Sequence, residues 1–267
     1  HQYQNAGTYD IKIKGKYEIL VGSTDAMRTA NYDKLKKVKQ WGTTGLKYVA
    51  FNYCSNLNEI VSPTENSFIN LIGIYLGYTS IQSIPEDLFA NCPNVTNFNH
   101  SFFHCKNLES IPVNLFANCP NVTNFSNLFF KCENLESIPV NLFANCPNVS
   151  SFQGTFGRCS NLTSIPEKLF ANCPNVMSFE GTFQNCDSIT SIPEKLFDNC
   201  KKVESFKGTF WCCYRLTGNA PELWKRGTNS EENEYNGNPN GEDCFAVCRG
   251  LENWDEIPDY WKSGEPE

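Results

Sequence analysis

The sequence predicts an α/β-type repeat solenoid, in which one short unit is stacked many times along a single axis. Two observations lead to this prediction. Apolar residues recur at a fixed period of 27 residues over residues 81–216, and cysteines recur at alternating spacings of 13 and 14 residues. A unit this short cannot bury its apolar residues within itself, so stacked neighbours must cover it and the core grows in one dimension.

Each element of the chain can be assigned in order. We expect a β-hairpin at residues 1–22, where apolar and polar residues alternate with the period of a half-buried strand. We expect Val38 and Trp41 in the next segment to cover the first coil, because terminal repeats are atypical. The predicted divisions are the hairpin at 1–22, a capping segment at 23–50, the solenoid at 51–224, an inserted loop at 225–243, a degenerate repeat and cap at 244–261, and a disordered tail at 262–267.

The repeat unit is clearest in residues 135–161, which read LESIPVNLFANCPNVSSFQGTFGRCSN. The Leu-x-x-Ile segment, for example Leu108 to Ile111, is expected to be the short strand, with the following proline ending the ladder. The Pro-x-x-Leu-Phe segment is expected to be a turn of helix or 3-10 helix, because proline is favoured at a first helical position. The Val-x-x-Phe segment is a second extended side, and an exchange of the two faces stays open.

Fourteen cysteines would ordinarily suggest a disulfide framework. Their periodicity favours another interpretation, because ten of them occupy two equivalent positions in each unit and there behave as small buried apolar residues. Cys212 and Cys244 lie off these positions on either side of the inserted loop. The alternatives for this pair are a disulfide and two free thiols. A metal site is not expected, because no C-x-x-C pair occurs.

Composition excludes several function classes. The formal net charge is −7 and the sequence pI is about 5.1, which argues against binding to nucleic acid. No apolar run is long enough to span a membrane. His100 and His104 occur in one copy only, and no nucleophile, metalloprotease or phosphate-loop motif is present. We therefore expect no enzyme, no catalytic residue, no cofactor and no metal. The glycosylation-type triplets at Asn94, Asn121 and Asn148 are interpreted as repeat-encoded turn residues.

The pattern C-x-x-L-x-x-I-P followed by V-x-x-F-x-x-x-F-x-x-C resembles the BspA-like leucine-rich repeats of bacterial surface proteins. The resemblance extends over about residues 46–261 when degenerate units are included. It implies a right-handed leucine-rich-repeat coil, export to the cell surface or the extracellular space, and adhesion to a host or bacterial macromolecule. The unit here is longer than the commonest unit of that family, which leaves the curvature of the coil open. We expect a monomer.

The N-terminal segment H-x-Y-x-x-A-G-T-Y-D-I-K-I resembles the closing hairpin of PKD-like β-sandwich domains. Only this final part of such a domain is present in the chain. The resemblance implies a sandwich domain that precedes the solenoid. A plain N-terminal cap hairpin is the alternative.

Two surfaces are candidates for ligand binding. The first is an acidic-to-hydroxyl strip on the Leu-x-x-Ile side, suited to a basic or hydrogen-bonding protein, whose residues are Glu109, Ser110, Glu136, Ser137, Thr163, Ser164, Thr190 and Ser191. The second is an aromatic platform for a polysaccharide beside the inserted loop, formed by Trp211, Trp224 and Tyr235, although aromatic end-capping would also explain these residues. A purely architectural role as a spacer is a third alternative.

Overall fold

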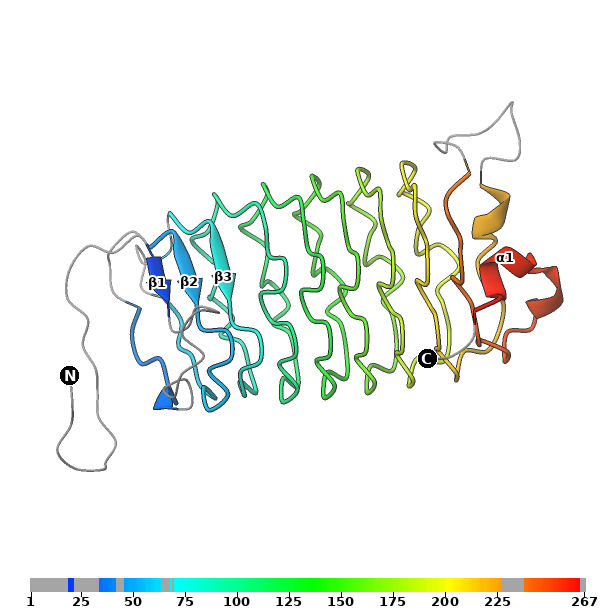
Figure 1. Cartoon of the computed structure of the whole chain (residues 1–267). Helices are drawn as coiled ribbons and strands as arrows, with labels where there is room; N and C mark the ends of the chain where they lie inside the picture. Colours follow the sequence, from blue (N-terminus) through cyan, green and yellow to red (C-terminus); the bar gives the residue numbers. More distant parts are fainter. Residues whose placement is uncertain are drawn as a thin grey trace.

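In the computed structural model the chain winds as successive coils along one axis (Figure 1). The structure describes residues 19–21, 34–41, 46–63, 68, 70–226 and 238–264. Strands β1 (Ile19–Val21), β2 (Tyr48–Ala50) and β3 (Gly73–Tyr75) form a parallel sheet in the order β1-β2-β3. Two short 3-10 helices, η3 (Leu223–Lys225) and η4 (Trp254–Glu256), and one helix, α1 (Asp259–Lys262), lie at the other end.

The strand side is the Val-x-x-Phe side, and the prediction that Leu-x-x-Ile forms the strand is wrong. Single parallel bridges continue the sheet direction from coil to coil through Asn97, Asn124, Ser151, Ser178, Ser205 and Asn240. Alternate residues of this side donate backbone hydrogen bonds across coils, as in Thr123 N to Thr96 O at 2.9 Å and Phe125 N to Ser151 O at 3.0 Å. The Leu-x-x-Ile segment makes fewer such bonds. The proline that follows it has no N–H with which to extend a ladder.

The predicted turn after each proline is present as single turns rather than as a helix. Leu115 N donates to Pro112 O at 3.2 Å, and Ala117 N donates to Asn114 O at 3.0 Å. These are the i to i+3 bonds of a tight turn. The segment after each proline is therefore a series of tight turns.

Stacked phenylalanine rings form the core. Phe98, Phe125 and Phe152 are fully buried, and each ring lies 5.8 Å from the next in the column, nearly parallel to it. Rings of a neighbouring column lie tilted against them, as Phe143 does against Phe152 at 4.7 Å. Offset-stacked and tilted contacts are the arrangements that aromatic quadrupoles favour. The ring columns therefore fix both the spacing and the register of successive coils.

The repeated cysteines line two buried columns and contact carbonyl oxygens of the preceding coil. On one column the contacts are short, as between Cys159 Sγ and Phe129 O at 3.2 Å. On the other they are longer, as between Cys146 Sγ and Phe116 O at 3.8 Å. Burial raises the pKa of both thiols to about 12. The column cysteines are free thiols that serve as core residues.

Several predicted boundaries shift at the ends of the solenoid. Ile19–Val21, assigned to a separate hairpin, pairs with β2 inside the solenoid sheet, and residues 1–18 lie outside the described residues. The repeat resumes before position 244, because Asn240 continues the bridge column from Ser205. Lys262, assigned to the disordered tail, belongs to α1, and residues 265–267 lie outside the described residues. The ammonium group of Lys262 donates to Trp254 O at 2.9 Å.

Candidate functional site

The predicted acidic-to-hydroxyl strip is a continuous exposed surface. Adjacent coils are in register along it, because Thr163 N donates to Glu136 O and Glu109 N donates to Gln82 O, at 3.3 and 3.1 Å. The strip lies directly over buried leucines and isoleucines, so the solenoid core holds its backbone. All eight of its residues are exposed: Glu109, Ser110, Glu136, Ser137, Thr163, Ser164, Thr190 and Ser191.

A second surface, which the sequence analysis missed, is a groove of about 300 Å³ on the extended side of the coils. We call it the glycine groove, because three of its residues are glycines of one column. It also carries amide, carboxylate, ammonium and indole groups. Its lining residues are Asn127, Gln153, Gly154, Glu180, Gly181, Gln184, Lys207, Gly208, Trp211 and Asp243.

The groove follows a column of residues with left-handed backbone. Gly154, Gly181 and Gly208 have φ of 61°, 57° and 56°. The same column holds Asn127 with φ 54° in the preceding coil and Asp243 with φ 56° in the following one. Asparagine and aspartate are among the residues that tolerate this conformation. A period of 27 residues between three glycines was the sequence signal for this groove.

Two side-chain amides lie over the glycines. A Cβ on Gly154 would stand 2.3 Å from Asn127 Oδ1, and a Cβ on Gly181 would stand 3.0 Å from Gln184 Cδ. These glycines therefore permit close approach of the amides. Gly208 differs, because a Cβ there would meet only Trp211 Cβ at 3.7 Å. The space beside Trp211 is thus open.

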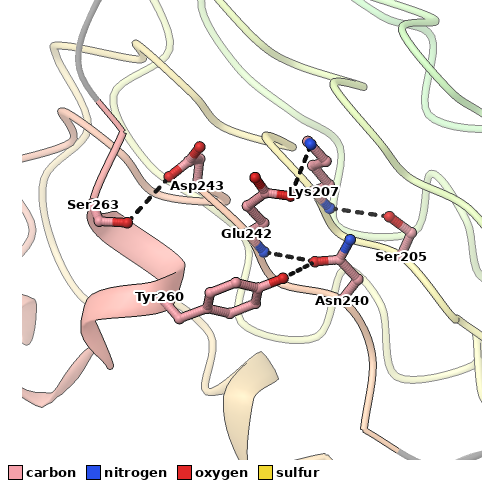
Figure 2. Close-up of polar contacts among 7 residues, drawn as sticks. All are labelled: Ser205, Lys207, Asn240, Glu242, Asp243, Tyr260 and Ser263. Atoms are coloured by element: carbon pink, nitrogen blue, oxygen red, sulfur yellow. Dashed lines mark hydrogen bonds and ion pairs between the residues drawn. The ribbon is translucent and has the colours of Figure 1, made fainter.

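A polar network holds the C-terminal wall of the glycine groove (Figure 2). Lys207 Nζ lies 2.7 Å from Glu242 Oε2, and Glu242 N donates to Asn240 Oδ1 at 3.0 Å. Tyr260 of α1 donates its hydroxyl to the same Asn240 oxygen at 2.9 Å. The hydrogen bond that Lys207 donates to Glu242 and the charges of Glu242, Glu180 and Asp243 raise the pKa of Lys207. Lys207 is therefore a positioned cation in an acidic surrounding.

The predicted aromatic platform is only partly represented at this groove. Trp211 lines the groove. Trp224 instead packs in the C-terminal cap, with its ring 6.2 Å from Phe245 and 6.4 Å from Trp261. Tyr235 lies outside the described residues. End-capping thus accounts for Trp224.

The other residues singled out from sequence have mostly structural surroundings. Cys212 and Cys244 are buried and are not joined to each other in a disulfide. His100 and His104 both have left-handed backbone, and burial lowers the pKa of each ring. Within the described part of the chain no group of three or more histidine, cysteine, aspartate or glutamate residues could hold a metal ion.

The turn side carries a shallower and longer groove of about 1070 Å³, lined by repeated alanine, asparagine and proline residues. Its asparagines bond across coils, as when Asn145 Nδ2 donates to Ala117 O at 3.1 Å. Two of the glycosylation-type asparagines do the same: Asn121 and Asn148 donate to Pro93 O and Pro120 O at 2.9 and 3.1 Å. Their amide nitrogens thus have a structural role in the stacking of the coils.

Comparison with protein-family models identifies the repeat. The model described as BspA type leucine rich repeat region matches residues 44–207 in 6 copies, which is more than half of the chain. No curated protein sequence matches the chain. Among the described residues, no helix is long and apolar enough to cross a membrane.

Several solved structures match this chain at low sequence identity. A chain of the Toll–Spatzle complex from Drosophila is 19% identical, with a TM-score of 0.35, and the match covers 73% of this chain and 29% of that one. A leucine-rich repeat protein from Bacteroides ovatus is 17% identical, with a TM-score of 0.20, and the match covers 71% of this chain and 74% of that one. A leucine rich cell surface protein from Faecalibacterium prausnitzii is 13% identical, with a TM-score of 0.25, and the match covers 95% of this chain and 92% of that one. The chain spans less than a third of the matched Toll–Spatzle chain.

Proposed function

Because this chain belongs to the BspA-type leucine-rich-repeat family, we propose that it is a non-enzymatic recognition module of the cell surface or the extracellular space. It binds a macromolecule of the host or of another bacterium through an exposed face of the solenoid. Leucine-rich-repeat domains generally mediate protein interactions, and stacked repeats create extended binding surfaces. A protein ligand is the first candidate.

The observation that supports this proposal most directly is the exposed strip at Glu109, Glu136, Thr163 and Thr190. These residues repeat once per coil on a backbone that the buried core holds in place. A rigid array needs little ordering when it binds, so less binding free energy is lost to conformational entropy. The two glutamates favour a partner that presents basic or hydrogen-bond-donating groups at matching intervals.

The test is binding of the purified chain to an array of matrix proteins and polysaccharides at low and high salt. A strip variant replaces the four glutamate or threonine residues and the four serines by alanine. A matched control replaces Glu167, Lys168, Glu194 and Lys195, which are equally exposed on the neighbouring turn. We expect a salt-sensitive protein hit that the strip variant loses and the control keeps. Equal binding by all three proteins would eliminate the strip.

A carbohydrate ligand is the second candidate, and the glycine groove around Trp211 is the observation that favours it. If the strip variant still binds a glycan from the array, the binding site is the glycine groove rather than the strip. Absence of any hit on the array would favour a role as a spacer within a longer surface protein.

A further inference from the structure

We propose that the glycine groove is a saccharide-binding site that takes a neutral mono- or disaccharide unit, alone or at the end of a longer glycan. The inference rests on the proposed recognition role and assigns a ligand class to a surface other than the strip. Five residues of the groove carry the argument: Gly208 supplies the space, Trp211 an apolar face, and Asn127, Gln184 and Glu180 the polar groups.

The open space beside Trp211 is not a requirement of the backbone. Gly208 has φ 56°, but Asn127 and Asp243 adopt φ of 54° and 56° at the same position of other coils. The fold therefore accepts a side chain at this position. A Cβ on Gly208 would have no heavy atom closer than 3.7 Å among non-neighbouring residues. The missing side chain at Gly208 leaves room for a ligand atom next to the indole.

The polar groups of the groove suit hydroxyl groups. Each sugar hydroxyl is both a donor and an acceptor, and side-chain amides offer both functions within one planar group. Asn127 and Gln184 lie close over the glycines, so packing limits their motion. Glu180 adds a carboxylate acceptor, and Trp211 adds an aromatic face for the apolar face of a pyranose ring. Apolar contact with a few converging polar groups is the usual composition of a small-molecule site.

The charges of the groove favour a neutral ligand over an anionic one. Lys207 is paired with Glu242 at 2.7 Å and also lies in the field of Glu180 and Asp243. The acidic groups outnumber this one paired cation among the groove residues, so a sialic or uronic acid would meet repulsion. The groove volume of about 300 Å³ lies at the lower end of ligand sites, which fits one or two sugar rings.

Saturation-transfer NMR tests the proposal directly. The whole chain is mixed at millimolar ligand concentrations with methyl glycosides of neutral hexoses and N-acetylhexosamines, with their disaccharides, with sialic acid, and with a lysine-rich peptide. We expect saturation transfer to at least one neutral saccharide and none to sialic acid. Transfer to the peptide alone would overturn the proposal in favour of a basic peptide ligand. Absence of transfer to every saccharide would also overturn it.

Two variants locate the site with little risk to the fold. Trp211→Gln introduces the residue that the preceding coil carries at Gln184, and Gly208→Asn introduces the residue that the same column carries at Asn127. Each should weaken saccharide binding by at least about tenfold while the thermal midpoint stays near that of the parent. Tyr214→Gln removes an aromatic side chain that is 51% exposed and lies outside the groove, and it should bind as the parent does. Unchanged saccharide affinity in both groove variants would contradict the assignment.

The strip variant separates this proposal from the proposed protein ligand. If the strip variant loses a protein partner but keeps saccharide binding, the two surfaces are independent and both proposals stand. If the parent binds a protein but no saccharide, the glycine groove assignment alone fails.

Discussion

Arg226 donates a hydrogen bond from Nη1 to the carbonyl oxygen of Cys200 at 3.1 Å, and from Nη2 to that of Phe197 at 3.0 Å. The preceding coil explains the choice of these two acceptors. There the thiol of Cys200 contacts Cys173 O at 3.5 Å and Phe170 O at 3.8 Å. The guanidinium of Arg226 therefore occupies the position that the next cysteine of the column would take. Arg226 therefore ends the cysteine column that contains Cys173 and Cys200.

Replacement of Arg226 by methionine should destabilise the C-terminal coils. The side chain is buried, so its loss leaves two carbonyls without these donors, at a cost of about 1–3 kcal/mol. It also removes the guanidinium that lies 5.3 Å from the centre of the Phe206 ring. In this variant, hydrogen exchange should be faster for the amides of residues 197–210 than for those of residues 98–125. Urea unfolding should show the decrease in the total free energy of unfolding relative to the parent. Arg215→Met, at an exposed position, is the control, and an equal effect of both substitutions would contradict a capping role.

Replacement of cysteine by serine should lower the free energy of unfolding by different amounts in the two cysteine columns. Cys159 Sγ lies 3.2 Å from Phe129 O, so a hydroxyl at this position can donate to that oxygen. Cys146 Sγ lies 3.8 Å from Phe116 O and 3.6 Å from Cys119 O, which is too far for a hydroxyl hydrogen bond without movement. We expect Cys146→Ser to lose about 1 kcal/mol more free energy of unfolding than Cys159→Ser. The two alanine variants provide the baseline for lost packing, and a reversed order of the serine variants would argue against the geometric explanation.

The stacking of coils could be predicted from sequence, but the identity of the strand side could not. A fixed apolar period identifies which residues are buried, since Leu108, Ile111 and Phe125 must all face the core. It does not say which side forms the ladder, because both sides carry β-compatible residues. The two sides differ at their ends, where the Val-x-x-Phe side continues to donate across coils and the other side meets a proline. Phe125 N reaches Ser151 O at 3.0 Å, and Asn127 N reaches Gln153 O at 2.7 Å. Pro112, at the end of the other side, has no such donor.

The strip and the groove differ in how far they could be predicted. The strip residues follow directly from the repeat, because exposed positions between two buried ones, such as Glu109 and Ser110, must face solvent. The groove depends on the absence of a side chain at Gly208 and on the side-chain directions of Asn127 and Gln184. Those directions depend on packing between coils, which the spacing of the glycines alone does not determine. For Trp224 the sequence left a glycan platform and end-capping open, because its contact with Trp261 joins two separate parts of the chain.

Trp261 of α1 should be essential for closing the C-terminal end of the core. Its ring lies 6.3 Å from Phe245 and 6.4 Å from Phe206, and only 6% of the residue is exposed. Trp261→Ala should lower the free energy of unfolding by about 3–5 kcal/mol, as for other large-to-small core substitutions. The exposed ring column should also promote association, measured by light scattering, because uncapped repeats are poorly soluble. Asp259→Ala on the same helix is the control, since that side chain is 99% exposed.

Alkaline pH should destabilise the protein through its buried thiols. Burial raises the pKa of Cys146 and of Cys159 from 9.0 to about 12. Above about pH 9 the unfolded chain releases thiol protons that the folded chain retains, so the unfolded state is favoured. The stabilisation by neutral thiols is therefore complete below about pH 9 and declines until the folded thiols ionise near pH 12, by up to about 1.4 kcal/mol per pH unit for each thiol.

Urea unfolding between about pH 8 and about pH 10 measures this effect. Lysine and tyrosine residues titrate in overlapping ranges, so the double variant Cys146→Ala, Cys159→Ala is the necessary comparison. It should be less stable than the parent at neutral pH, because it loses packing, but its stability should fall less steeply as pH rises. Parallel pH profiles for the two proteins would show that the thiols do not carry the pH dependence.

The buried thiols should also resist alkylation at about pH 8 in the native protein. The thiolate is the reactive form, and burial disfavours it. Denaturant exposes the thiols and should make them reactive.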